Sequence, residues 1–286
     1  YLRDFEGKQD VLRYTLTSIT PETKDADFTW ADFQSKNNNE LLAIFGNFVN
    51  RTVVLTHKYY DGVIPPMGEL TVEEKEMLIK MAEFPQIIGS SIEKYRFREA
   101  LGEFINLARL GNKYLTDTEP WKKFKENPEE VKKILHISLQ ICASLAVLGE
   151  PFLPFTSAKL KKMLNMGSYS WIDGGRIDLL KSGDMINQPE YLFEKIEDEM
   201  IQKQVQKLLD AKVTNTINQV PVEPSKEDIT YDDFTKMDLR VCTVLEAEKV
   251  AKTKKLMKLK VDTGVETREI ISGIAEYYEP ADLVGK

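Results

Sequence analysis

The feature that most constrains the fold is a change of hydrophobic period near residue 212. From residue 28 to residue 210, apolar residues recur every three or four positions, which predicts amphipathic helices. Residues 212–228 are polar, carry two prolines and show no period, which is typical of a linker. From Thr230 onward apolar and polar residues alternate, which predicts strands. We therefore expect a helical domain followed by a small β domain.

Several helix boundaries in the first part are marked by their residues. Thr71-Val-Glu-Glu74 fits a capping box, and Pro128 is followed by acidic residues, as in a first helical turn. Gly62 ends one helix, while Pro85 either kinks a helix or marks a first turn. The short connections favour an antiparallel bundle. The expected helices are 30–60, one beginning at Thr71, 96–115, 128–148, 155–164 and 191–209.

The second part carries three alternating segments, 239–245, 256–262 and 268–274, which predict three strands. Three strands leave open sheet edges, and native proteins rarely leave such edges unprotected. The chain also begins without a methionine, inside a helical pattern, and it ends abruptly at Lys286. We therefore expect it to be a piece of a longer protein, with an incomplete β domain.

Composition narrows the class of protein. The chain has 286 residues with a formal charge of −7, and 42% of them are hydrophobic, enough to bury a sizeable core. Cys142 and Cys242 lie far apart and cannot form a zinc site, so a reduced, cytoplasmic setting is expected. The charged start has no apolar signal region. Polar residues interrupt the apolar stretch 134–153, which predicts a buried helix rather than a membrane span.

The candidate site combines an amide, a guanidinium and an indole. Asn47 and Arg51 are four residues apart on one predicted helix, so they share a face. Arg51 can donate hydrogen bonds to a cytosine edge, and Asn47 can donate and accept. Trp121, next to Pro120, offers a stacking surface for an unpaired base. On spacing alone the alternative stays open that Asn47 and Arg51 lie on a solvated helix face and Trp121 covers the core.

The sequence offers little support for a catalytic site or a metal-binding site. His57 and His136 have no Cys, Asp or Glu at ligand spacing, so a structural role is favoured for each and no metal site is expected. The sequence shows no glycine-rich phosphate loop and no nucleophile–base pair. Lys94, Arg96 and Arg98 fit either a contact with RNA or a solvated helix start.

Several motifs in the first part resemble one family in order and distance: Asn47-Phe-Val-Asn-Arg51-Thr, Lys58-Tyr-Tyr-Asp-Gly62, and Asn112-Lys-Tyr114 through Glu119-Pro-Trp121. Residues 1 to about 210 resemble the part of the methionyl-tRNA synthetases, class I enzymes, that follows their KMSKS loop. The resemblance implies that 1–27 is a connection from a catalytic domain and 28–210 the helical anticodon-binding domain. It implies that Asn47, Arg51 and Trp121 read the CAU anticodon, chiefly its first base, and that Pro120 holds the tryptophan.

A second resemblance covers the β part. Phe234-Thr-Lys-Met-Asp238-Leu-Arg240-Val, the segment 255–262 and Ile271-Ser-Gly-Ile274 are similar to the OB-type tRNA-binding domain of many members of this family. Residues 211–229 are then a linker, and 230–286 the N-terminal half of an OB fold. The family often has a His-Pro-bearing loop where this chain has Val250-Ala-Lys-Thr, which leaves the loop contacts open. The expected contacts to the tRNA backbone, from a lysine run at 249–260 without an acid, are Lys252, Lys254, Lys255 and Lys258.

The resemblances together imply a mainly α fold, an antiparallel helix bundle followed by an incomplete OB segment. They imply a function in reading the CAU anticodon for a ligase that attaches methionine to tRNA with ATP. The HIGH and KMSKS motifs are absent, so these residues alone are not expected to catalyse that reaction. The alternative is a noncatalytic tRNA-binding or dimerisation scaffold.

The resemblances also imply cofactors and partners. ATP, Mg²⁺ and, where a zinc site exists, Zn²⁺ would belong to the catalytic domain, and no cofactor is expected in residues 1–286. The implied partners are tRNA(Met), the catalytic domain of the same chain and a second copy through the complete OB domain. The expected location is the cytoplasm, without a membrane.

Overall fold

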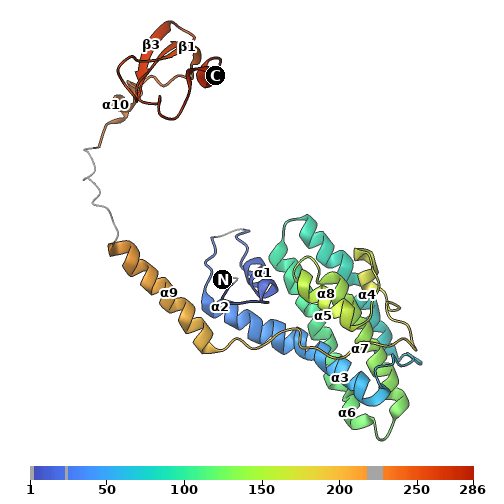
Figure 1. The fold of residues 1–286 in the computed structure, drawn as a ribbon. Coiled ribbons are helices and arrows are strands. Elements are labelled where there is room, and N and C mark those ends of the chain that lie inside the picture. Colours follow the sequence, from blue (N-terminus) through green and yellow to red (C-terminus); the bar gives the residue numbers. More distant parts are fainter. Residues whose placement is uncertain (1–2, 23–24, 218–227) are drawn as a thin grey trace. The chain divides into compact units, whose positions relative to one another are not determined.

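In the computed structural model the chain forms two compact units, Tyr1–Asn218 and Gln219–Lys286. The structure describes residues 3–22, 25–217 and 228–286, except for the side chains of 212–217. Figure 1 shows the helices of the first unit and the small sheet of the second. Most of the expected linker, 211–229, lies outside the described residues.

The first unit is a helix bundle, which confirms the mainly α fold. α2 (Trp30–Ser35), η1 (Lys36–Gly46) and α3 (Asn47–Tyr60) form one continuous helix, and its middle part is a π-helix (Figure 1). The remaining helices are α1 (Gln9–Ser18), α4 (Val72–Glu93), α5 (Phe97–Thr118), α6 (Pro120–Lys123), α7 (Pro128–Leu148), α8 (Pro154–Met163), η2 (Trp171–Gly175) and α9 (Asp198–Ile217).

Side-chain caps place several of these helix ends. The backbone N–H of Glu74 donates to the Thr71 hydroxyl at 3.2 Å, and the Glu74 carboxylate accepts from the Thr71 N–H at 2.8 Å. This reciprocal pair confirms the capping box at the start of α4. Asp61, with φ 53°, ends α3 in the left-handed conformation one residue before Gly62. Pro85 lies inside α4 rather than at its start.

α7 is the core helix of the bundle. It is the helix among the described residues that is long and apolar enough to span a membrane, and 89% of its apolar window is buried inside the unit. Its buried polar residues bond within the fold: the Gln140 amide donates to the Leu180 carbonyl at 2.7 Å, and its oxygen accepts from the Leu180 N–H at 3.2 Å. The expectation of a buried helix here is confirmed.

The helix expected at 191–209 is wrong in its first turns. Residues 191–197 are not helical, and α9 begins at Asp198 and continues to Ile217, into the expected linker. Phe193 and Ile196 are buried and anchor this segment on the core. Side-chain amides replace the helical bonds, since Asn37 donates to the Glu194 carbonyl at 2.8 Å and Asn38 to the Ile196 carbonyl at 2.9 Å.

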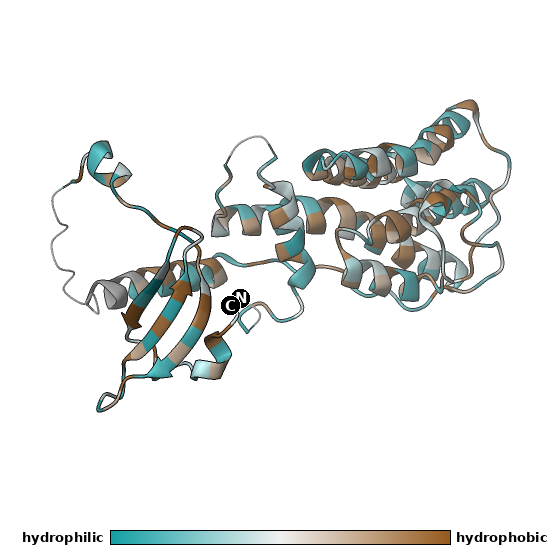
Figure 2. Cartoon of the chain, turned by 90° about the horizontal axis from the view of Figure 1, so that it is seen from above, coloured by the Kyte–Doolittle hydropathy of each residue, from teal (hydrophilic) through white to brown (hydrophobic). Residues whose placement is uncertain are grey.

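The second unit holds α10 (Tyr231–Thr235), β1 (Thr243–Lys249), β2 (Met257–Asp262), β3 (Thr267–Ser272) and α11 (Pro280–Leu283). The strands form an antiparallel sheet in the order β1-β2-β3, and polar and apolar bands alternate along them in Figure 2. The expected first strand, 239–245, is displaced toward the C-terminus. β2 pairs with β1 only as far as Thr243, so Leu239 and Val241 lie beyond the ladder and are exposed.

Candidate nucleic-acid interface

Trp121 is the second residue of α6, directly after the long helix α5. Glu119, with φ 45° and ψ 55°, turns the chain between the two helices. Pro120 is buried at the first helical position, where its missing N–H costs nothing. Trp121 is half-buried and packs against the bundle core. The left-handed link and the buried proline therefore fix the indole at the end of α5.

Arg51 lies over the indole of Trp121. Its guanidinium carbon is 4.6 Å from the ring centroid, which is a cation–π contact. Asn47, one helical turn earlier on α3, is exposed. The structure thus brings Arg51 and Trp121 together across 70 positions of sequence, with Asn47 on the same helix as the arginine. The Trp121 indole is partly exposed and partly packed against the core.

The seam between α3 and α5 positions these residues, and sequence reasoning missed it. A Cβ added at Gly111 would lie 2.4 Å from the Phe48 ring, so only glycine permits this approach of the two helices. The adjacent Asn112 donates its side-chain amide to the Ile44 carbonyl at 2.5 Å. That carbonyl lies in the π-helical part, three residues before Asn47. The signal in the sequence was a Gly-Asn pair, Gly111-Asn112, inside an amphipathic helix.

An aromatic brace holds α6 on α3. The rings of Tyr59 and Phe124 are stacked with centroids 3.9 Å apart, and the Tyr60 hydroxyl donates to the Pro128 carbonyl at 3.0 Å. Burial raises the pKa of Tyr60 to about 12, with a further contribution from Glu129. The chain that follows Trp121 is therefore attached to the end of α3 at two points, Phe124 and Pro128.

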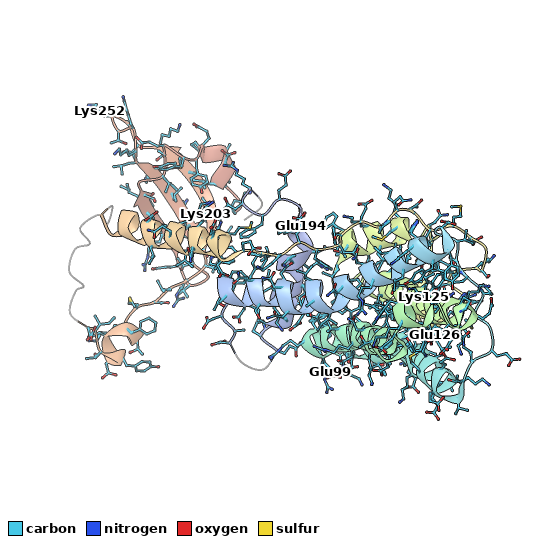
Figure 3. The ribbon with its side chains drawn as sticks, turned by 90° about the horizontal axis from the view of Figure 1, so that it is seen from below. Glu99, Lys125, Glu126, Glu194, Lys203 and Lys252 are labelled. Atoms are coloured by element: carbon cyan, nitrogen blue, oxygen red, sulfur yellow. The ribbon has the colours of Figure 1, made fainter. Side chains whose placement is uncertain are left out.

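The lysines of the second unit divide into two groups. Lys252, Lys254 and Lys255 lie in the turn between β1 and β2, are exposed, and have no ion pair among the described residues; Figure 3 shows Lys252 at the tip. Lys258 lies between Glu269 at 3.0 Å and Glu248 at 3.8 Å. The hydrogen bond to Glu269 raises the pKa of Lys258. The lysine run itself contains no acidic residue, but Glu248 on β1 and Glu269 on β3 pair with Lys258.

Both histidines have hydrogen-bond partners within the bundle. The Nδ1–H of His136 donates to the Pro65 carbonyl at 2.7 Å, and its Nε2 accepts from the Gln140 amide at 3.0 Å. Burial lowers the pKa of His136 despite the bond to Pro65. His57 donates from Nε2 to the Asn187 carbonyl at 2.9 Å. Within residues 3–22, 25–217 and 228–286, no three His, Cys, Asp or Glu residues are grouped to hold a metal ion.

An indole and a guanidinium on a helical bundle, with a lysine-bearing turn on a small antiparallel sheet, are features typical of RNA-binding proteins. Comparison with known families makes the class specific. The anticodon binding domain of methionyl tRNA ligase matches residues 64–212. Class I tRNA synthetases (M) match residues 2–53, and a tRNA-binding domain family matches residues 239–286. Because the first match covers more than half of the chain, the chain belongs to the methionyl-tRNA ligase anticodon-binding family.

Curated relatives match along the whole chain. A methionine–tRNA ligase of Cytophaga hutchinsonii is 59% identical over 286 residues, which are all of this chain and 42% of that protein. One of Flavobacterium johnsoniae is 53% identical, over all of this chain and 44% of that protein. The chain thus spans less than half the length of these relatives.

Solved structures share the fold of the chain. The apo form of Mycobacterium tuberculosis methionyl-tRNA synthetase superposes with a TM-score of 0.61 at 20% identity, over 66% of this chain and 39% of that one. The same synthetase in complex with methionyl-adenylate gives 0.61 at 20% identity, over 64% and 37%. At this identity the likeness is one of fold.

Proposed function

We propose that the chain reads the anticodon of tRNA(Met) through Asn47, Arg51, Pro120 and Trp121. The observation that supports this is the Arg51 guanidinium 4.6 Å from the centroid of the Trp121 ring. An unpaired cytosine stacks on the indole, and Arg51 donates to its O2 and N3 acceptors. Asn47 adds a group that both donates and accepts, and Pro120 holds the tryptophan in place.

The second unit adds affinity that does not depend on sequence. Lys252, Lys254, Lys255 and Lys258 contact phosphates of the tRNA backbone, which favours binding by releasing counterions. Lys252, Lys254 and Lys255, the exposed lysines of the turn, supply most of this sequence-independent affinity. Lys258 supplies less, because Glu269 already neutralises part of its charge.

The complete protein attaches methionine to this tRNA with ATP in the cytoplasm. Its ATP and Mg²⁺, and any Zn²⁺, are bound by a catalytic domain outside these residues, and two copies associate through the complete OB domain. Relatives named methionine–tRNA ligase match this chain along its whole length, which supports this proposal over the noncatalytic scaffold. The residues of this chain contribute selection: they bind the anticodon arm and hold it for the catalytic domain.

A titration with tRNA(Met) and with a copy changed at the first anticodon base tests the proposal. Trp121→Ala weakens binding of the CAU tRNA by about 1–3 kcal/mol, one stacking contact. Trp171→Ala is the matched control, since that indole donates to the Pro85 carbonyl at 2.9 Å within the fold. An unchanged dissociation constant for Trp121→Ala at fixed salt overturns the proposal.

A further inference from the structure

One exposed stripe of α5 carries cations and no carboxylate. At 3.6 residues per turn, its members fall within a sector of about 60°, and the acids of α5 project outside that sector. Lys113 is paired with Asp117 at 2.7 Å, which leaves the two arginines as the cations of interest. The exposed members of the stripe are Arg98, Gly102, Arg109, Lys113 and Thr116.

Gly102 in the middle of this stripe has no packing reason to be glycine. It is exposed, and a Cβ added to it would meet nothing within 4 Å. Glycine in a helix interior is destabilising relative to alanine, so its presence needs another cause. A helix without a side chain at one exposed position lets another molecule approach its backbone closely.

Gly102 lies in a groove of about 380 Å³ between α1, η1 and α5, lined also by Lys36, Arg98 and Arg109. The acids of this groove are already bonded. Glu40 accepts from Lys36 at 2.6 Å and from the Tyr14 hydroxyl.

The other acid of the groove, Glu99, accepts from the Ser91 hydroxyl at 2.9 Å. Among the described residues, no carboxylate lies within ion-pair distance of the Arg98 or Arg109 guanidinium. Arg109 donates to the side-chain oxygen of Asn106 at 2.8 Å. The groove therefore presents two guanidinium groups to an incoming anion.

The groove and the Trp121 site lie along the same pair of helices. Phe45 is 5.5 Å from Phe104, and farther along, Asn112 bonds the Ile44 carbonyl and Gly111 meets Phe48. η1–α3 and α5 thus pack against each other in the stretch between the groove and Trp121. From Gly102 to the end of α5 at Thr118 is sixteen residues, or roughly 24 Å of helix.

We propose that this groove binds the phosphate backbone of the same RNA whose unpaired base lies at Trp121. Arg98 and Arg109 contact the phosphates, and Gly102 lets the strand approach the helix. The inference rests on the proposed function and adds to it a second contact, on the stem side of the anticodon loop. A phosphate strand fits the groove because two guanidinium groups with no carboxylate partner among the described residues line it, and because its α5 wall is exposed at Arg98, Gly102 and Arg109.

The test uses three single variants, Gly102→Gln, Arg98→Gln and Arg109→Gln. The dissociation constant of each is measured for full-length tRNA(Met) and for the isolated anticodon hairpin with a short stem. Lys80→Gln is the charge-matched control, since Lys80 is an exposed cation outside the groove. Trp121→Ala reports separately on the anticodon site. Thermal unfolding of every variant is measured alongside binding.

Gly102→Gln is expected to raise the Tm by about 2–4 °C while weakening full-length tRNA binding at least about fivefold. Each arginine variant lowers the salt slope of tRNA binding by about 1. The groove variants are expected to bind the short hairpin as tightly as the unchanged chain does. Lys80→Gln is expected to leave the binding of both RNAs unchanged. Unchanged tRNA binding by Gly102→Gln, or equal losses for tRNA and hairpin, overturns the inference. If Trp121→Ala also leaves binding unchanged, the proposed function fails with it.

Discussion

The two candidate RNA surfaces of this chain are built in opposite ways. In the bundle, Trp121 is fixed by a buried proline, an aromatic brace and the guanidinium of Arg51. In the second unit, Lys252, Lys254 and Lys255 project from a turn and touch no acid in the described part of the chain. A packed site suits recognition of one base, because its geometry is set before binding. Exposed charges suit contact with any phosphate backbone.

The largest expected effect comes from a change at the seam between α3 and α5, which holds the packed site in place. Gly111→Val places a side chain where the Phe48 ring already lies, 2.4 Å from the new Cβ. The free energy of unfolding of the bundle is expected to fall by about 3 kcal/mol, from overpacking. Urea unfolding followed by circular dichroism measures it.

The matched control for the seam is Gly102→Ala on the same helix, where a Cβ meets open space. This variant is expected to gain about 1 kcal/mol from helix propensity. If both variants change stability by the same amount and sign, the seam does not hold the site.

The turn lysines are expected to respond to salt rather than to sequence. Replacing Lys252, Lys254 and Lys255 together by Gln lowers the slope of log Kd against log salt concentration by about 2–3. All tRNAs weaken alike. Lys258→Gln changes the slope by less than any of the three, because Glu269 already lies 3.0 Å from its ammonium. A loss confined to one tRNA would assign these lysines to base recognition instead.

The smallest expected effect concerns pH. The folded pKa of His136 is lowered, so the folded state binds fewer protons than the unfolded chain between that pKa and about 6.5. The stability of the bundle therefore falls as pH drops below about 6.5, by under ~1 kcal/mol at first. Urea midpoints between pH 7.5 and 5.5 show this.

His57→Gln is the control for the pH experiment, since the chain contains only two histidines. This variant keeps the fall in stability, whereas His136→Gln removes it. A fall that disappears with His57 instead contradicts the assignment.

Several parts of this architecture were readable from the sequence because their causes are local. The capping box at Thr71 and Glu74 and the core helix α7 follow from residues a few positions apart. The joint role of Arg51 and Trp121 was reached only through motifs that resemble a family, since spacing alone favoured a solvated helix face for Arg51 and a core position for Trp121.

Other parts depend on contacts distant in sequence. The extended segment at 191–197 exists because Asn37 and Asn38 bond its carbonyls. The start of β1 depends on where β2 ends, and the pairing of Lys258 depends on strand register. The π-helical turns of η1 have no local sequence signature.

The central claim is that Arg51 and Trp121 read the first anticodon base, and a double-mutant cycle tests it most directly. Arg51→Gln is combined with a cytosine-to-uracil change at that base, and the four dissociation constants are measured at one salt concentration. The account predicts a coupling energy of about 1–3 kcal/mol, because the arginine discriminates between the two bases. Additive effects, with coupling below about 0.3 kcal/mol, would contradict it.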